Sequence, residues 1–131
     1  LENQICKAMK STYIQRKRSK GFNLQAQSPD GREVVSCTRP SLFGNPYDFD
    51  DKVEAVRGYT DLIKMNDELL RITRRHEPDF KPGKDTQVVT SELIRQRLSG
   101  KHLACWCAPG QPCHVQDVLL PIVNGEEPKT Y

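Results

Sequence analysis

The spacing of hydrophobic residues along the chain predicts one long helix near its middle. Apolar side chains recur three to four residues apart, which is the repeat of a helix that buries one face. Asp50 or Asp51 precedes the repeat and is a suitable N-cap, and the helix is expected to end near Ile72. The buried stripe is expected to contain Val53, Val56, Tyr59, Leu62, Ile63, Leu69 and Leu70.

Two shorter helices are predicted in the last third of the chain. Thr90 or Ser91 is the expected cap of the first, which covers residues 92–98. The second is expected over residues 112–123, because a proline suits the first position of a helix. Pro121 should bend or shorten this helix, since proline removes a backbone donor.

Three short stretches predict strands, over residues 13–18, 34–37 and 102–107. The charged side chains of the first stretch suit a strand at the edge of a sheet. Strand and helix signals alternate in the second half of the chain. We therefore expect an α/β fold, a small single-domain sandwich with a short mixed sheet flanked by helices and at least one parallel pairing.

A chain of 131 residues is long enough for one domain with a single core. We expect this α/β domain to cover residues 13–131 and residues 1–12 to be frayed. Residues 76–87 are polar and contain two prolines and a glycine. They predict an exposed connection of unusual length, which suits a lid or a linker.

Charge and cysteine content limit the classes of function. The net charge of +3 is too small for the field of the whole molecule to drive strong non-specific binding to nucleic acid. Five cysteines, in a chain whose first residues lack signal-peptide character, predict free thiols in a reducing, cytoplasmic setting. No stretch approaches the roughly twenty apolar residues of a membrane span, so we expect no membrane partner.

The stretch with the most reactive side chains is residues 103–117, LACWCAPGQPCHVQD, which holds three cysteines, the single tryptophan and a histidine. A strand, a turn and a helix start are predicted in that order, with Cys113 and His114 in the first turn of the helix. A helix N-terminus lowers the pKa of a thiol and offers free backbone N–H groups to an anion. Asp117 follows one turn later and is placed to orient the imidazole of His114. We therefore predict a catalytic group of Cys113, His114 and Asp117.

Two other interpretations of the same cysteines stay open. Side chains alternate along a strand, so Cys105 and Cys107 place two thiols on one face. Together with Cys113 and His114 they supply four ligands that zinc accepts, although the spacing differs from the usual Cys-x-x-Cys zinc motif. The leading prediction therefore has no cofactor, and zinc is the alternative. Cysteine is also among the most buried residue types, so these thiols equally suit a packed core.

A proline-bounded loop and a basic run supply the candidate ligand-binding residues. Residues 39–47, RPSLFGNPY, follow a predicted strand and are expected at the sheet edge where α/β proteins bind ligands. Arg39 presents a planar fork to a phosphate or carboxylate, and Asn45 presents a donor and an acceptor. It is equally consistent with the sequence that Arg39 and Asn45 are ordinary side chains of a surface loop and bind no ligand. The remaining candidates are Arg16, Arg18, Lys20 and Cys107.

Three pieces of the chain resemble one protein family. They are residues 15–22 (QRKRSKGF), 39–47 (RPSLFGNPY) and 103–119 (LACWCAPGQPCHVQDVL). The Arg-Pro and Gly-Asn-Pro loop, paired with Cys-Trp-Cys and Cys-His, is similar to that of small phage and bacterial proteins classed as domain of unknown function family 4326. This chain departs from the family pattern in a long segment before the loop and in the polar connection. The resemblance implies a fold and a location for the site, but no reaction.

The leading hypothesis is a protein that binds a nucleotide or a nucleic-acid component where the Cys-His turn meets the Arg-Pro loop. It acts as a transferase or hydrolase if it is an enzyme, which the sequence leaves open. The alternative is a non-catalytic accessory module of the phage type, stabilised by zinc, that binds nucleic acid or a host protein. Its binding residues would be the basic run of Arg16, Lys17, Arg18 and Lys20. The first hypothesis requires the two segments to share one concave surface.

Overall fold

The computed structural model describes residues 10–39, 41–47, 49–81 and 88–130. Residues 1–9 of the segment expected to be frayed, and residues 82–87 of the polar connection, lie outside the described residues, so both expectations stay predictions. The described strands are β1 (Tyr13–Gln15), β2 (Val34–Ser36) and β3 (His102–Cys105). The described helical elements are the short turn η1 (Gln25–Gln27), α2 (Lys52–His76), α3 (Ser91–Leu98), the π-helical segment η2 (Val115–Leu119) and α4 (Leu120–Val123).

The sheet is small and parallel. β3 lies between β1 and β2 and pairs in parallel with both, so that Leu103 stands opposite Tyr13 on one side and Val35 on the other. All four residues of β3 are buried, as befits the central strand, and β1 lies at the edge as predicted. The α/β class and a parallel pairing are confirmed. The sheet is not mixed, because both described pairings are parallel and helices carry the chain from the end of β2 back to the start of β3.

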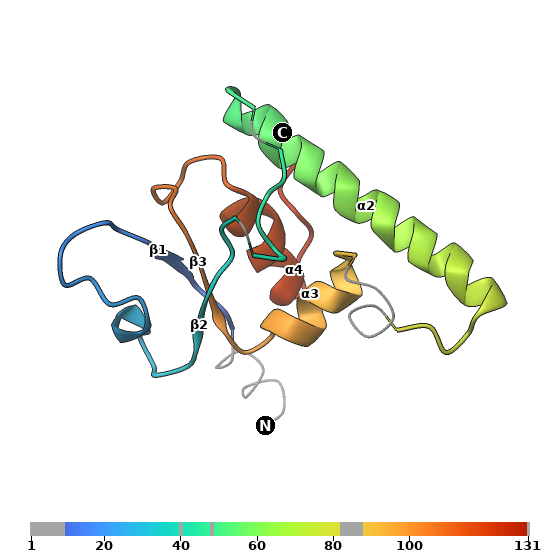
Figure 1. Ribbon diagram of the computed structural model, residues 1–131, viewed down its shortest axis with the longest axis horizontal. Helices are drawn as coiled ribbons and strands as arrows, with labels where there is room; N and C mark the ends of the chain where they lie inside the picture. The colour runs from blue at the N-terminus through green and yellow to red at the C-terminus, as the bar shows by residue number, and fades with distance from the viewer. Residues whose placement is uncertain (1–9, 40, 48, 82–87, 131) are drawn as a thin grey trace.

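Helix α2 is the long helix that the apolar repeat predicted. The carboxylate of Asp51 caps it by accepting a hydrogen bond from the backbone N–H of Val53 at 2.9 Å. The buried side chains of this helix are Val56, Tyr59, Ile63 and Asn66. Leu69 was expected in the buried stripe but is 53 % exposed. The reason is visible in Figure 1, where the C-terminal part of α2 extends past the other elements.

The two shorter helices form in the predicted regions. The hydroxyl of Thr90 caps α3 by accepting the backbone N–H of Leu93 at 3.1 Å. The last helix starts later than residue 112, because η2 begins only after His114 and α4 follows it. Pro121 lacks the N–H for a regular helical bond, and the wider π-helical turn lies just before it. His114 is the first helical residue and Cys113 immediately precedes it, so both stand at the entry to the helix.

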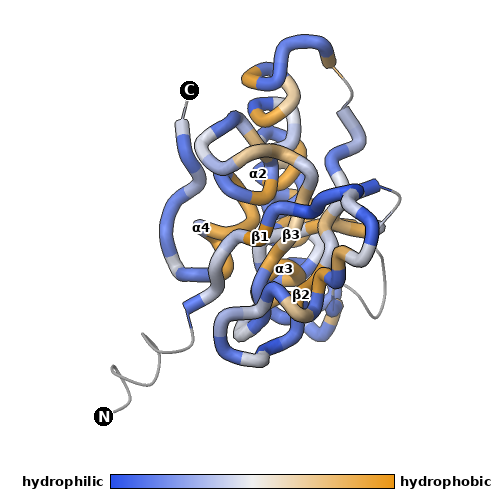
Figure 2. Tube along the Cα trace, turned by 90° about the vertical axis from the view of Figure 1, so that its left-hand side faces the viewer, coloured by the Kyte–Doolittle hydropathy of each residue, from blue (hydrophilic) through white to orange (hydrophobic). Residues whose placement is uncertain are grey.

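One hydrophobic core joins the sheet to the helices. Segment η2 contacts both β3 and α2, while α3 contacts both α2 and α4. Figure 2 shows hydrophobic stretches gathered where the strands meet α3 and α4. Fully buried side chains include Tyr59, Leu93, Leu98, Leu103 and Leu119. In the part of the chain that the structure describes, no helix has both the length and the apolar character needed to cross a bilayer.

Candidate functional site

The carboxyl ends of the three strands meet at one edge of the sheet, because the strands are parallel. Ligands of α/β proteins bind at this edge. The chain leaves β2 into the loop of residues 38–47 and leaves β3 into Trp106. A pocket of about 260 Å³ opens there, between this loop, the start of α2 and the cysteine-rich turn. It brings together five of the residues singled out in the sequence, namely Arg39, Asn45, Cys107, Cys113 and His114.

Gly44 lets the loop of residues 38–47 close on itself. A Cβ atom at this position would lie 2.7 Å from the backbone nitrogen of Arg39 and 2.9 Å from its Cα. Backbone hydrogen bonds hold the same turn, since the N–H of Ser41 donates to the carbonyl of Thr38 at 2.9 Å and the N–H of Gly44 donates to the carbonyl of Ser41 at 3.0 Å. The Gly-Asn-Pro motif therefore begins with the residue type that the turn requires.

Asn45 ties the loop to helix α2. Its Nδ2 donates to the carbonyl of Ala55 at 3.0 Å, and its Oδ1 accepts the backbone N–H of Tyr47 at 2.9 Å. The ring of Tyr47 rests against Gly58, where a Cβ atom would lie 3.1 Å from Tyr47 Cδ2. Asn45 was predicted to bind a ligand. These two hydrogen bonds position Tyr47 and the loop, and ligand binding by Asn45 stays a prediction.

His114 is held in one tautomer just behind the pocket surface. It is 8 % exposed, and its Nε2 lies 2.8 Å from the carbonyl oxygen of Cys37. A carbonyl oxygen only accepts, so Nε2 carries the proton and Nδ1 keeps a lone pair. The ring of Tyr59 packs against the imidazole at a centroid distance of 5.1 Å. Burial lowers the pKa of His114 and so favours the neutral ring.

Cys105, Cys107 and Cys113 form a cluster of thiols beside His114. The donor atoms of Cys105, Cys113 and His114 all lie within 4.8 Å of one another. The pKa of Cys105 is lowered, because its sulfur receives hydrogen bonds from the Cys113 thiol and from the backbone N–H groups of Cys107 and Trp106. The same thiol contact and burial raise the pKa of Cys113. The contact between the two thiols therefore favours a thiolate at Cys105, whereas the sequence predicted the low-pKa thiol at Cys113.

The carboxylate of Asp117 caps the start of the last helix. Its Oδ2 accepts the backbone N–H of Cys113 at 3.1 Å, and the backbone N–H of Asp117 donates to the carbonyl of Cys113 at 2.9 Å. Asp117 was expected to orient the imidazole of His114, which is instead anchored by the carbonyl of Cys37. The expected anion hole at Cys113 is occupied by the chain itself, because an acid in the first turn reaches back to cap its own helix.

Two arginines of the basic run lie over Trp106. The guanidinium carbons of Arg16 and Arg18 are 4.3 and 4.5 Å from the centroid of the indole ring, the geometry of a cation–π contact. Arg16 also donates to the hydroxyl of Thr38 at 2.9 Å. The expectation that these two arginines lie together is confirmed. Lys20 is exposed and does not line the pocket.

Tyr13 is a residue of the site that sequence reasoning missed. Its hydroxyl donates to the carbonyls of Cys105 at 3.1 Å and Cys107 at 2.5 Å, so one side chain on β1 fixes the backbone of the Cys-Trp-Cys segment. Burial raises the pKa of Tyr13, and the hydroxyl keeps the proton that it donates. Tyr13 and Cys105 are 92 positions apart, so no local pattern links them.

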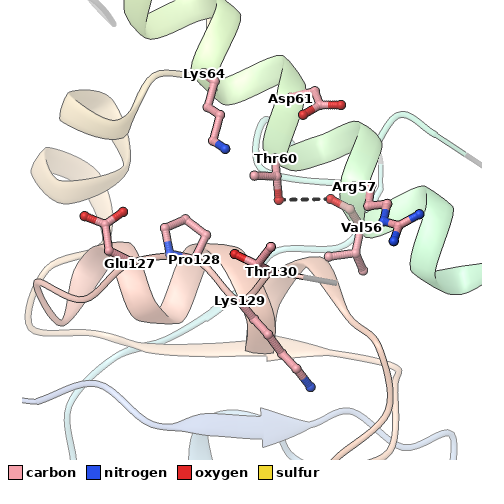
Figure 3. Close-up of a pocket in the computed structure, with 9 residues that line it drawn as sticks. All are labelled: Val56, Arg57, Thr60, Asp61, Lys64, Glu127, Pro128, Lys129 and Thr130. Atoms are coloured by element: carbon pink, nitrogen blue, oxygen red, sulfur yellow. Dashed lines mark hydrogen bonds between the residues drawn. The ribbon is translucent and has the colours of Figure 1, made fainter.

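A second and larger pocket lies between α2 and residues 127–130 (Figure 3). Its volume is about 430 Å³. The side chains that line it carry mixed charges, and the hydroxyl of Thr60 donates within the helix to the carbonyl of Val56 at 3.1 Å. Among the described residues that line this pocket, none is aromatic and none carries sulfur. It therefore offers neither a stacking surface nor a reactive side chain, and the pocket at the strand ends is the better candidate.

Comparison with known proteins identifies a family. The family model described as "Domain of unknown function (DUF4326)" matches residues 14–125, so the chain belongs to this family and the resemblance seen in its motifs is confirmed. No match was found among curated proteins or among solved structures. The family match assigns no activity, and the chemistry of the pocket has to supply the function.

Proposed function

We propose that this protein binds a nucleotide in the pocket at the carboxyl ends of the strands. The observation that carries the proposal is the lining of the pocket, where aromatic rings and cations stand together: Tyr47, Phe49, Trp106, Arg39 and Lys52. A nucleotide offers the matching groups, a flat base that stacks on aromatic rings and phosphates that pair with guanidinium and ammonium groups. The net charge of the chain is small, so recognition depends on this local grouping.

The size of the pocket limits the ligand. A volume of about 260 Å³ lies just below the usual range of ligand pockets. The aromatic wall is open to solvent, since Trp106 is 37 % and Phe49 51 % exposed. A base with its sugar fills such a pocket, and the phosphates then extend toward the rim, where Arg39 is exposed. These dimensions favour a single nucleotide over a larger cofactor.

A single-stranded nucleic acid is the second candidate, favoured by the position of Arg16 and Arg18. Both guanidinium groups lie within 4.5 Å of the Trp106 ring and extend the cationic surface beyond the pocket. Proteins that bind single strands combine cations of this kind with an aromatic ring on which a base stacks. Salt distinguishes the two ligands. A strand that pairs several phosphates loses affinity steeply as salt rises, whereas a nucleotide in a pocket loses less.

Transfer or hydrolysis of the bound nucleotide, predicted from Cys113, His114 and Asp117, has less support than binding. Cys113 is 2 % exposed and its pKa is raised, which makes it a poor nucleophile. The carboxylate of Asp117 is engaged with the backbone of Cys113. His114, neutral and with a lone pair on Nδ1, is the best candidate for a base. Turnover of a nucleotide by the purified protein is the observation that would support the enzymatic prediction.

The single tryptophan makes the proposal measurable. Fluorescence of Trp106 is titrated with the four nucleoside monophosphates and with a short oligonucleotide, each at low and moderate salt. We expect a stacked base to quench the fluorescence. Arg39→Ala should weaken nucleotide binding about 10-fold or more, because it removes one charge-assisted hydrogen bond.

Arg57→Ala is the matched control for Arg39→Ala. Arg57 is exposed, lines the other pocket and pairs with Glu54 at 2.6 Å, so its loss should leave the affinity unchanged. Absence of quenching by every nucleotide, or equal effects of the two substitutions, would refute the proposal. Quenching by the oligonucleotide alone, lost steeply with salt, would favour the second candidate.

A further inference from the structure

The thiol cluster beside the pocket takes no part in stacking or phosphate pairing, and its composition is that of a metal centre. We propose that Cys105, Cys113 and His114 bind a zinc ion, with Cys107 as the fourth ligand. Thiolate sulfur and imidazole nitrogen are the ligands that zinc prefers in proteins. Among the described residues, Cys105, Cys113 and His114 are the group whose donor atoms come together. The proposal does not depend on nucleotide binding.

The three donor atoms already lie near the separations that a metal ion requires. All are within 4.8 Å of one another. In a tetrahedral site with Zn–S bonds of about 2.3 Å and Zn–N bonds of about 2.0 Å, neighbouring donors are about 3.5 to 3.8 Å apart. The group needs to contract by little more than about 1 Å.

The imidazole of His114 is oriented as a metal ligand usually is. Its Nε2–H donates to the carbonyl of Cys37 at 2.8 Å, which leaves the lone pair of Nδ1 for coordination. Metal-binding histidines regularly donate their other N–H to a carbonyl or carboxylate in this way, because the bond fixes the tautomer and the ring. Tyr59 packs against the same ring and limits its rotation.

The sulfur of Cys105 lies where the other ligands and two backbone donors meet. It faces the thiol of Cys113 and the backbone N–H groups of Trp106 and Cys107. Zinc binding by three cysteines and one neutral histidine releases the remaining thiol protons to solvent and leaves a centre of net charge −1. Arg39 and Lys52 line the same pocket and offset this charge.

The backbone holds the ligands in place before any metal arrives. Cys105 is the last residue of the central strand β3, and Cys113 is bound to Asp117 through both its N–H and its carbonyl. Cys107 is half-buried, and its thiol interacts with those of Cys105 and Cys113. The hydroxyl of Tyr13 fixes the carbonyl of Cys107 at 2.5 Å. Cys107 is outside the group of three donor atoms that already converge, so its side chain has to turn toward them to supply the fourth ligand.

Cys37 shows what an ordinary buried cysteine looks like in this fold. It is completely buried in the hydrophobic core, and its thiol contacts the carbonyl of Val35 at 3.7 Å. It is not part of the group of converging donor atoms. The clustered cysteines differ from it because their sulfurs meet one another and an imidazole, a grouping that packing alone does not require.

The test is the metal content of the full chain, purified without added metal or chelator and measured by mass spectrometry. We expect about one zinc ion per chain. Cys105→Ala and Cys113→Ala should lose the metal, whereas Cys37→Ala, a matched loss of a buried cysteine outside the group, should keep it. Cobalt substituted into the wild-type protein should give the absorption bands of a tetrahedral thiolate site. Chelation should lower the melting temperature by about 5 °C or more.

The wild-type protein decides the question even if the cysteine variants fail to fold. A wild type that contains no zinc and whose melting temperature responds to neither added zinc nor chelator would overturn the proposal. Stoichiometric zinc in a folded Cys105→Ala variant would also overturn it. If nucleotide quenches Trp106 in protein that binds no metal, the proposed function is supported and the metal site is refuted. If the protein contains zinc but no nucleotide quenches Trp106, the metal site is supported and the proposed function is refuted.

Discussion

Replacing Gly44 by alanine tests whether the turn of residues 38–47 builds the pocket. The added Cβ atom would lie 2.7 Å from the backbone nitrogen of Arg39, 2.9 Å from its Cα and 3.0 Å from the carbonyl carbon of Thr38. All three neighbours are backbone atoms, so rotation of a side chain gives no relief. The turn itself has to open, which strains the hydrogen bond of 3.0 Å from Gly44 N–H to the carbonyl of Ser41.

The expected cost of Gly44→Ala follows from these contacts. Overpacking of this kind costs about 1–3 kcal/mol, and a weakened backbone hydrogen bond adds up to about 1 kcal/mol. Alanine also restricts the unfolded chain, which offsets about 0.4–1 kcal/mol. At the middle of these ranges, the net loss in the free energy of unfolding is about 2 kcal/mol. For a chain of this length, the melting temperature should fall by roughly 3–12 °C.

Gly58→Ala is the matched substitution, and it should behave differently. Its Cβ atom would lie 3.1 Å from the ring of Tyr47, which is a partly exposed side chain and not backbone, and alanine favours a helix over glycine by about 1 kcal/mol. Thermal unfolding of both variants, followed by circular dichroism, should show a lower melting temperature for Gly44→Ala and an equal or higher one for Gly58→Ala. Both should weaken quenching by nucleotide. A Gly44→Ala variant that melts at or above the wild-type temperature would refute the close packing inferred here.

Two further predictions concern Tyr13 and Glu92. Tyr13→Phe removes the hydroxyl that donates to the carbonyls of Cys105 and Cys107. It should lower the free energy of unfolding by about 1–2 kcal/mol and change the fluorescence of Trp106, which lies between those cysteines. An unchanged denaturant midpoint would contradict the predicted loss of stability. The pKa of Glu92 is lowered by its two hydrogen bonds to Arg74, at 2.7 and 2.6 Å. The pair therefore stabilises the fold fully at pH values above the ordinary carboxyl pKa. This stabilisation is lost as the pH falls through the lowered pKa of Glu92. Both partners are about one-third exposed, so Glu92→Gln should cost less than about 1 kcal/mol at pH 7, and the difference in melting temperature between the two proteins should shrink at low pH. A difference that grows on acidification would contradict the assignment.

The parts of the fold that the sequence predicted correctly are those determined by residues close to one another along the chain. The start of α2 is set by Asp51, whose carboxylate bonds to the next turn, and the cap of α3 is set by Thr90 in the same way. The strands are short, but their alternation with helices was sufficient for the α/β class. The exposure of Leu69 was missed because the apolar repeat shows only which face of the helix is hydrophobic. It does not show how much of that face the rest of the molecule covers.

The location of the site was predictable, while the roles of its residues were not. Segments that follow parallel strands emerge at one edge, which is why the loop of Arg39 and the turn of Cys113 share a pocket. Which of the two thiols is favoured as a thiolate depends on the hydrogen bonds that each sulfur receives, and these come from contacts between Cys105 and Cys113 across the turn. The carboxylate of Asp117 accepts the backbone N–H of Cys113 at the start of its own helix. The spacing of these residues in the sequence is compatible with this contact and equally with a contact to the imidazole of His114.

Tyr59 explains why the pocket and the core act as one unit. Its hydroxyl donates to the carbonyl of Phe43 at 3.0 Å inside the loop of residues 38–47, while its ring packs on His114 beside the thiol cluster. The side chain is 1 % exposed, so the same packing that anchors α2 to the sheet also sets the distance between the loop and the cluster. A change that shifts α2 therefore moves the aromatic wall of the pocket and the thiol cluster together. Substitutions in the core beneath Tyr59 should alter the proposed nucleotide binding and the proposed zinc binding in parallel, whereas substitutions on the exposed end of α2 should alter neither.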